Sequence, residues 1–164
     1  MLFGGRNMRD ILHENVGHAQ NLDEVYRGVL RAFQVLDADG PSQAFLYVSG
    51  VITSYGDMRV NLAEMLRRTE EIRVLCVDRQ VFAPTCVFPE PLAQWMNGMR
   101  YRHEDWMAFW TKILCSGYVG GVVLTPGWER SRGADMEYAI ARNLGLAVYR
   151  YDDRELSIIH DGVL

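Results

Sequence analysis

The chain has 164 residues, of which 49% are hydrophobic and 23% charged, a composition that fits one globular domain and excludes a disordered, collagen-like or coiled-coil chain. The formal net charge of −4 argues against a broad electrostatic interaction with duplex nucleic acid. Of the 17 basic residues only Lys112 is a lysine. The arginine excess has two explanations: a bias of the coding sequence, or guanidinium groups that bind phosphate or carboxylate.

The three cysteines and four histidines are scattered along the chain. Their spacing matches neither a disulfide framework nor a metal-binding motif, so we predict no metal and no cofactor. The first residues lack the pattern of a signal peptide, and no apolar run has the length of a membrane span. The sequence therefore predicts a protein of the reducing cytoplasm without a membrane partner.

Residues 1–43 are expected to form an N-terminal helical extension. Asn21 and Asp23 can cap a helix in this region, because their side-chain oxygens can accept hydrogen bonds from its first amides. The run at 44–52 that follows is apolar, β-branched and aromatic, as expected of a buried strand. The apolar residues on one face of the helix are Val25, Val29, Leu30, Phe33 and Leu36.

Strands and helices are expected to alternate along the rest of the chain. Apolar strands that alternate with helices indicate an α/β fold, with a parallel sheet covered by helices on both faces. In such sheets the ligand lies beyond the carboxyl ends of the strands. The predicted elements are a helix over 59–72 that buries Val60, Ala63, Leu66 and Thr69, a strand at 74–77, helices at about 92–100 and 103–115, a strand from 120, a helix over 133–144 that stops at Gly145, and a strand over 147–151.

Two segments that follow predicted strands contain candidate site residues. In the first, Ser49 and Gly50 would let a ligand approach the backbone, and Tyr47 brings a phenol hydroxyl nearby. In the second, residues 124–139, a strand leads through a glycine-containing loop into a helix whose free N-terminal amides can bind an anion. Ser131 can add a hydroxyl there, and Arg130 or Arg132 can add charge.

Glu137 is the candidate catalytic acid of this site. It lies about one turn inside the second helix, on the stripe that, with Ala141, should face the sheet. A carboxylate beside an apolar sheet edge is costly unless it is paired or used. Each residue also has a structural explanation: Glu137 can complement the helix dipole, Ser131 can be an N-cap, and Tyr47 can be a core residue. Their convergence at one sheet edge favours an active site.

Two stretches of the sequence carry a resemblance to a known family. They are Tyr-Val-Ser-Gly at 47–50, followed by a Thr/Ser loop and Asn61, and Leu-Thr-Pro-Gly-Trp-Glu-Arg-Ser-Arg-Gly-Ala-Asp-Met-Glu at 124–137. Both resemble the nucleoside 2-deoxyribosyltransferase-like superfamily, in particular phage and bacterial members with a Pro-Gly-Trp-Glu-x-Ser-x-Gly-Ala motif. The resemblance covers about 44–151, so that 152–164 would form a C-terminal tail. It implies a flavodoxin-like sheet and cleavage or transfer of the N-glycosidic bond of (deoxy)nucleosides or their 5′-monophosphates.

The resemblance also implies roles for individual residues. Glu137 would be the nucleophile that attacks the anomeric carbon and forms a glycosyl-enzyme intermediate, and Tyr47 would hydrogen-bond and orient it. Ser131 and Gly133 would hold a 5′-phosphate, as the matching positions do in phosphate-dependent relatives. A homodimer is expected, because relatives complete their sites with a neighbouring subunit.

The chain departs from the family at the aspartate that usually contacts the base and helps to protonate the leaving group. That position falls near Trp110 or Lys112, neither of which is acidic. Glu104 or Asp105 can supply the acid, with Trp106 or Trp110 stacking on the base; alternatively, the acids complement their own helix dipole and the tryptophans belong to the core or a dimer interface. A second hypothesis is a catalytically silent module that binds a nucleotide. Flavin-dependent electron transfer is disfavoured, because the phosphate loop does not follow the first strand.

Overall fold

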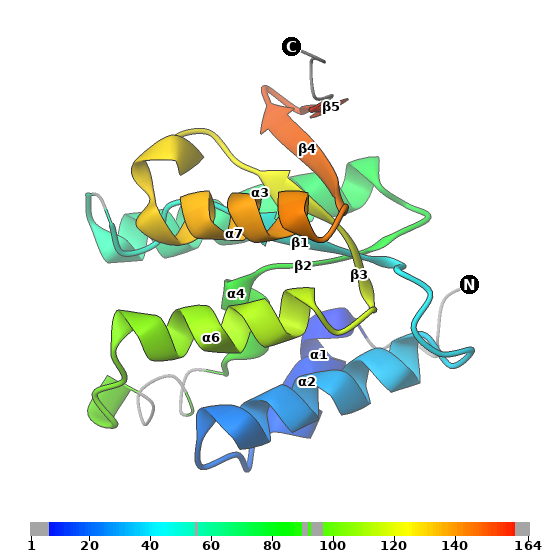
Figure 1. Ribbon diagram of the computed structural model, residues 1–164, viewed down its shortest axis with the longest axis vertical. Helices are drawn as coiled ribbons and strands as arrows, with labels where there is room; N and C mark the ends of the chain where they lie inside the picture. Colours follow the sequence, from blue (N-terminus) through cyan, green and yellow to red (C-terminus); the bar gives the residue numbers. More distant parts are fainter. Residues whose placement is uncertain (1–6, 55, 90–91, 93–96, 160–164) are drawn as a thin grey trace.

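The computed structural model describes residues 7–54, 56–89, 92 and 97–159 and is built around a five-stranded sheet (Figure 1). The strand order is β2-β1-β3-β4-β5; β1 to β4 are parallel, and β5 pairs antiparallel with β4. This arrangement confirms the predicted α/β fold class and has the strand order of flavodoxin-like folds, with an antiparallel edge strand. The strands are β1 (Phe45–Ser49), β2 (Gln80–Phe82), β3 (Val119–Leu124), β4 (Ala147–Asp152) and β5 (Glu155–Ile158).

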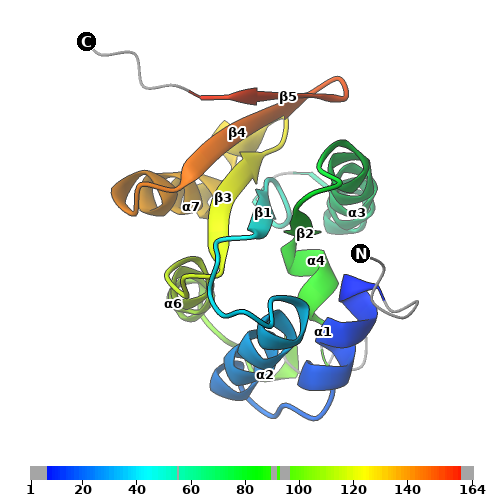
Figure 2. The ribbon, with the colours of Figure 1, turned by 90° about the vertical axis from the view of Figure 1, so that its right-hand side faces the viewer.

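The helices lie on both faces of the sheet. They are α1 (Met8–Val16), α2 (Leu22–Leu36), α3 (Met58–Leu75), α4 (Pro84–Val87), α6 (His103–Leu114), the short 3₁₀ helix η1 (Trp128–Arg130) and α7 (Arg132–Asn143). Figure 2 shows α3 on one side of the sheet and α6 and α7 on the other. α1 and α2 pack against α4 and α6 at the end of the molecule away from β5. Within the described ranges, no helix is both long and apolar enough to cross a membrane.

The core joins α2 to the sheet. β1 lies between β2 and β3, and all five of its residues are buried. The ring of Phe33 on α2 lies 4.2 Å, centroid to centroid, from that of Phe45 on β1. Val25 and Val29 are also fully buried, which confirms the predicted apolar face of this helix. Since burying one such side chain contributes roughly 1.5–3 kcal/mol, the N-terminal helices stabilise the sheet substantially.

The predicted strand at 74–77 is wrong. α3 continues through Leu75, and Val74 and Val77 are 75% and 88% exposed. A turn follows, in which the amide of Cys76 donates to the Ile72 carbonyl, and the strand is the shorter β2. The apolar, β-branched composition of 74–77 resembles a strand, but these residues are the solvent-facing end of a helix whose buried face is already complete.

The predicted buried face of α3 is wrong at Val60 and Ala63 and correct at Thr69, and Leu66 is half-buried. Val60 is 65% exposed and Ala63 is exposed, whereas Met65, Thr69 and Ile72 are buried. The hydroxyl of Thr69 donates to the Met65 carbonyl at 2.7 Å, which satisfies a polar group inside the core. Asn61 and Arg68 lie seven residues apart on one face of this helix, and both line a cavity at the carboxyl end of the sheet that is described below.

The sequence does not predict two elements at the chain ends. α1 is the first, and β5 lies within the predicted tail and pairs Tyr151 with Leu156. The helix expected over about 92–100 includes residues 93–96, which lie outside the described residues; Leu92, Asn97 and Gly98 are helical. The predicted helix stop at Gly145 is confirmed by its φ of 69°, in the left-handed region. The core-facing residues of α1 are Met8, Ile11, Leu12 and Val16.

Candidate active site

α7 holds Glu137 against the sheet. The helix begins after Ser131, whose hydroxyl oxygen accepts a hydrogen bond from the Ala134 amide at 3.3 Å. The buried residues of α7 are Ala134, Glu137 and Ala141, a stripe at helical spacing that faces β3 and β4. Glu137 is only 6% exposed, so its carboxyl group lies inside the protein, as the sequence pattern predicts.

Two hydroxyl groups of β1 hold the Glu137 carboxyl group. Tyr47 donates to Oε1 at 2.8 Å, and Ser49 donates to Oε2 at 2.5 Å. Alternate residues of a strand point to the same face, so Tyr47 and Ser49 both reach the α7 side of the sheet. The hydrogen bond expected between Tyr47 and Glu137 is therefore present. Ser49, expected to face a ligand, instead gives its hydroxyl to the carboxyl group.

The surroundings of Glu137 move its titration to neutral pH. Burial raises the pKa of Glu137 to about 7, and the hydrogen bonds from Ser49 and Tyr47 partly oppose this rise. Burial, together with the negative charge of Glu137, raises the pKa of Tyr47 well above its usual value. Tyr47 consequently remains a protonated donor, while Glu137 changes charge near neutral pH. A carboxyl group with such a shift is typical of functional sites.

At the start of α7, Ser131 has a structural role and Gly133 has none. Ser131 is buried and caps the helix, in agreement with its structural explanation. A Cβ at Gly133 would lie 3.8 Å from the Ser131 hydroxyl and 3.9 Å from the Met107 sulfur, which is ordinary contact. Neither a positive φ nor internal packing requires glycine at this position. The close approach of a ligand remains a reason for it.

Gly50 is required by packing inside the protein. A Cβ at this position would lie 2.0 Å from the hydroxyl oxygen of Thr125. Thr125 in turn donates its amide and its hydroxyl to the Ser49 carbonyl, at 2.9 and 3.1 Å. The glycine that we expected to let a ligand approach therefore makes room for a side chain that ties the end of β3 to the end of β1.

The candidates on the base side have structural partners. Asp105 accepts a hydrogen bond from the Arg102 amide at 2.8 Å as part of a capping box, and Glu104 is exposed in the first turn of α6. Neither carboxylate hydrogen-bonds to Glu137. Trp110 is 7% exposed, and its ring centroid lies 5.6 Å from that of Tyr47. Trp106 packs on other aromatic rings, so both tryptophans act as core residues in this structure.

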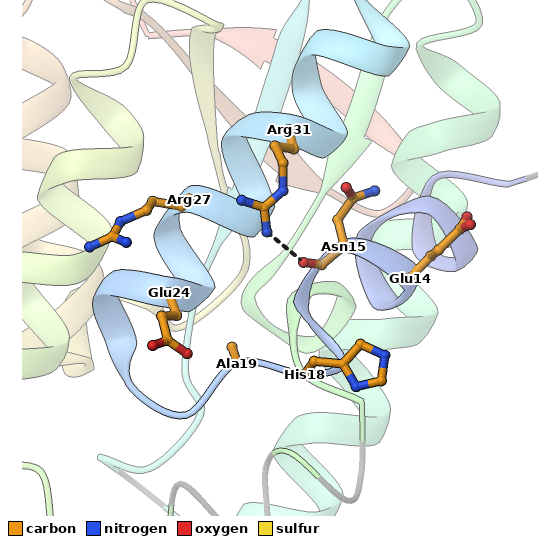
Figure 3. A pocket seen from close by; sticks show the side chains of 7 residues that line it. All are labelled: Glu14, Asn15, His18, Ala19, Glu24, Arg27 and Arg31. Atoms are coloured by element: carbon orange, nitrogen blue, oxygen red, sulfur yellow. Dashed lines mark hydrogen bonds between the residues drawn. The ribbon is translucent and has the colours of Figure 1, made fainter.

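The structure contains a large cavity far from this carboxyl group, between α1 and α2. Its volume is about 430 Å³, and Arg31 donates to the Asn15 carbonyl beside it at 3.2 Å (Figure 3). Arg27 and Glu14 point away from each other, so the polar groups do not converge on a common ligand position. This cavity is a poor candidate for a site. Its lining is Glu14, Asn15, His18, Ala19, Glu24, Arg27 and Arg31.

A second cavity, of about 240 Å³, lies at the carboxyl ends of β1 and β3. Arg130, one of the two candidate arginines, lines it, whereas Arg132 is exposed at the start of α7 and does not. In the part of the chain that the structure describes, no group of three or more His, Cys, Asp or Glu side chains could hold a metal ion. The lining is Val51, Val60, Asn61, Glu64, Met65, Arg68, Thr125, Pro126, Gly127 and Arg130.

The fold and the site define an α/β protein with flavodoxin-like strand order and a buried carboxyl group at the carboxyl edge of its sheet. The family model described as a domain of unknown function, DUF4406, matches residues 44–150, and the chain belongs to this family. No curated protein and no solved structure matches the chain. The matched segment contains Tyr47, Ser49 and Glu137, and it leaves out α1, α2 and β5.

Proposed function

We propose that this protein cleaves or transfers the N-glycosidic bond of a small (deoxy)nucleoside or its 5′-monophosphate, with Glu137 as the nucleophile. The observation that carries the proposal is the buried carboxyl group of Glu137, held by the hydroxyls of Tyr47 and Ser49 at the carboxyl edge of the sheet. The resemblance of residues 47–50 and 124–137 to the nucleoside 2-deoxyribosyltransferase-like superfamily supports it.

The reaction proceeds in two displacements. One oxygen of the Glu137 carboxylate attacks the anomeric carbon as the bond to the base nitrogen breaks, and the base leaves with the bonding electrons. Water or a second base then attacks the same carbon and releases the carboxylate, and the proton that this acceptor loses neutralises the departed base. The positive charge that develops on the sugar ring is stabilised by the Glu137 carboxylate, because water is excluded from this buried position.

The two hydroxyls orient the nucleophile without blocking it. Each carboxylate oxygen has two lone pairs, and each oxygen of Glu137 accepts one hydrogen bond from β1. One lone pair per oxygen therefore remains for attack. Since two donors fix the plane of the carboxylate, less conformational entropy is lost when the transition state forms.

Base release from a panel of nucleosides and their 5′-monophosphates, measured by chromatography, tests the proposal. We expect the wild-type protein to release at least one base and Glu137→Gln to release none. Glu129→Gln is the matched control, because Glu129 is an exposed glutamate on η1. No release above the Glu137→Gln background on any substrate would refute the proposal. Added free base distinguishes transfer from hydrolysis.

A catalytically silent nucleotide-binding module is the second candidate. The observation in its favour is that Asp105, the nearest match to a leaving-group acid, is part of a helix cap with Arg102. Calorimetric binding of a nucleotide without any base release would support this alternative. If no nucleotide binds, both candidates fail.

We also propose that the protein acts as a homodimer in a reducing compartment such as the cytoplasm. The family resemblance supports the dimer, as do two exposed apolar residues: Met136 on α7, 38% exposed, and Leu144 at the C-cap of this helix, 44% exposed. Three free cysteines, one of them the exposed Cys115, support a reducing compartment. Light scattering during size-exclusion chromatography should give the mass of two chains; the mass of one chain would contradict the dimer.

A further inference from the structure

The second cavity occupies the place where the two central connections of the sheet separate. β1 continues through α3 toward β2, and β3 continues through η1 and α7 toward β4, on the opposite face (Figure 2). Connections that diverge from neighbouring parallel strands open a crevice at the carboxyl edge, where α/β proteins bind their ligands. The cavity of about 240 Å³ lies here, between the start of α3 and residues 125–130.

The charged groups that line this cavity favour an anion. Arg68 and Arg130 contribute two guanidinium groups, against the single carboxylate of Glu64. Arg67, which lies outside the cavity, already binds that carboxylate, with contacts of 2.6 and 2.9 Å. The hydrogen bond from Arg67 is the main reason that the pKa of Glu64 lies below its usual value. Arg67 thus shares the charge of Glu64 from outside the cavity, and the lining itself holds two guanidinium groups against one carboxylate.

Arg68 is held in position but retains the capacity to bind a ligand. Its Nε lies 2.9 Å from Glu64, and its Nη1 donates to the Pro126 carbonyl at 3.5 Å. The second contact is at the long limit of a hydrogen bond between nitrogen and oxygen, so a phosphate oxygen would be a stronger acceptor. The contact with Glu64 meanwhile fixes the side chain, which lowers the entropy lost on binding.

The wall of the cavity is linked to Glu137 through Ser49, the last residue of β1. Thr125, in the cavity wall, donates twice to the Ser49 carbonyl, and the Ser49 hydroxyl donates to Glu137. Val51, also in the wall, follows Ser49 by two residues, a span of roughly 7 Å at most.

We propose that this cavity binds the phosphate of a nucleoside 5′-monophosphate, with Arg68 and Arg130 as its ligands. The inference rests on the proposed function and deepens it, because it selects the monophosphate over the nucleoside as substrate. It also places the phosphate on the α3 side of the sheet edge. Ser131, the alternative ligand, is buried and uses its hydroxyl oxygen to cap α7.

Two matched pairs of variants test the proposal. Arg68→Gln is compared with Arg59→Gln, an exposed arginine on the same helix that does not line the cavity. Arg130→Gln is compared with Arg132→Gln, an exposed arginine two residues away that does not line the cavity. The probes are inorganic phosphate, the four common 2′-deoxynucleoside 5′-monophosphates and the matching nucleosides. Binding is measured by calorimetry and by thermal shift at constant ionic strength.

We expect Arg68→Gln and Arg130→Gln each to weaken the binding of phosphate and monophosphates about tenfold, the effect of losing one charged hydrogen bond. Nucleoside binding should stay unchanged, and the two control variants should change the Kd less than about twofold. Weakening in Arg132→Gln alone would overturn the proposal in favour of a phosphate at Ser131. Equal weakening in both members of each pair, or none in any variant, would also overturn it.

These outcomes separate this inference from the proposed function. Selective loss of phosphate binding without base release by the wild-type protein would support the cavity and refute the enzyme. Base release that is equally fast from nucleosides and monophosphates in all four variants would support the enzyme and refute the phosphate site. Arg130 is exposed, so Arg130→Gln remains informative even if Arg68→Gln disturbs the packing of α3.

Discussion

Glu137 and Glu64 lie on opposite faces of the same sheet edge and have opposite surroundings. Glu137 on α7 is held by two hydroxyls, and burial raises its pKa to about 7. Glu64 on α3 contacts Arg67 and Arg68, which hold its pKa below the usual value. The comparison shows that neighbouring groups shift the pKa of the same type of side chain in opposite directions. Glu137 changes its charge near neutral pH, whereas Glu64 stays ionised beside two arginines.

Removing the carboxylate of Glu137 should have the largest effect. We expect Glu137→Gln to lower kcat/KM for base release by about 10³-fold or more, because the substitution removes the proposed nucleophile and keeps the shape of the side chain. Steady-state kinetics on the best substrate of the panel measure this, with Glu129→Gln as the control. A Glu137→Gln protein that keeps a tenth of the activity would show that the buried carboxylate is not the nucleophile.

The raised pKa of Glu137 should appear in the pH dependence of stability. The folded state binds this proton more tightly than the unfolded chain does, so Glu137 lowers the free energy of unfolding as the pH rises from about 4.5 to about 7. The loss amounts to about 3 kcal/mol and is complete above pH 7. Urea denaturation at pH 5 and pH 8 should therefore show Glu137→Gln gaining stability relative to the wild type at the higher pH. Parallel pH profiles of the two proteins would contradict the shift.

The hydroxyls of Ser49 and Tyr47 should set the pH dependence of activity. Both hydrogen bonds lower the pKa of Glu137, and that from Ser49 has the larger effect. Ser49→Ala and Tyr47→Phe should thus move the acidic limb of the kcat/KM profile to higher pH, by about one unit or less. Ser54→Ala, which removes an exposed hydroxyl from the same loop, should leave the limb in place. An unchanged profile in Ser49→Ala would mean that its hydroxyl does not act on the reacting carboxylate.

Replacing Glu64 should have the smallest effect on the free energy of unfolding, and this effect should depend on pH in the opposite direction to that of Glu137. Its lowered pKa stabilises the folded protein above about pH 4.5, and this contribution disappears as the pH falls through the folded pKa. Because the side chain is about a third exposed, Glu64→Gln should cost less than about 1 kcal/mol at pH 7 and less still in high salt. Urea denaturation at two salt concentrations measures this. A larger, salt-independent loss would mean that Glu64 supports the core.

Local sequence patterns predict that Glu137 and Tyr47 lie at the same sheet edge, and the resemblance to the nucleoside 2-deoxyribosyltransferase-like superfamily implies the hydrogen bond between them. Tyr47 lies on a strand that is buried throughout, and Glu137 shares the buried stripe of its helix with Ala141. The partner of Ser49 could not be predicted, because a serine on a buried strand can point to a ligand, a carboxylate or the backbone. Only the distance between β1 and α7 selects Glu137.

The cavity beside α3 could not be predicted from the sequence, for a different reason. Val60, Ala63 and Leu66 indicate one face of this helix, but Val60 is exposed, and packing on the sheet selects Met65 and Ile72 instead. With the wrong face assigned, nothing connects Arg68 to residues 125–130. Likewise, the exposed apolar residues at 74–77 have the composition of a strand and lead to a strand prediction at the wrong place. The actual strand β2 has three residues, and its position is set by pairing with β1. Tertiary packing overrides local pattern at both points.

The stereochemistry of the product tests the central claim, that Glu137 forms a covalent bond to the sugar, most directly. Base release is run with methanol as the acceptor, and NMR assigns the anomeric configuration of the methyl glycoside. Two displacements at the anomeric carbon predict that the wild-type protein retains the β configuration of the substrate and that Glu137→Gln forms no product. An inverted, α-configured glycoside would contradict a glycosyl-enzyme intermediate on Glu137.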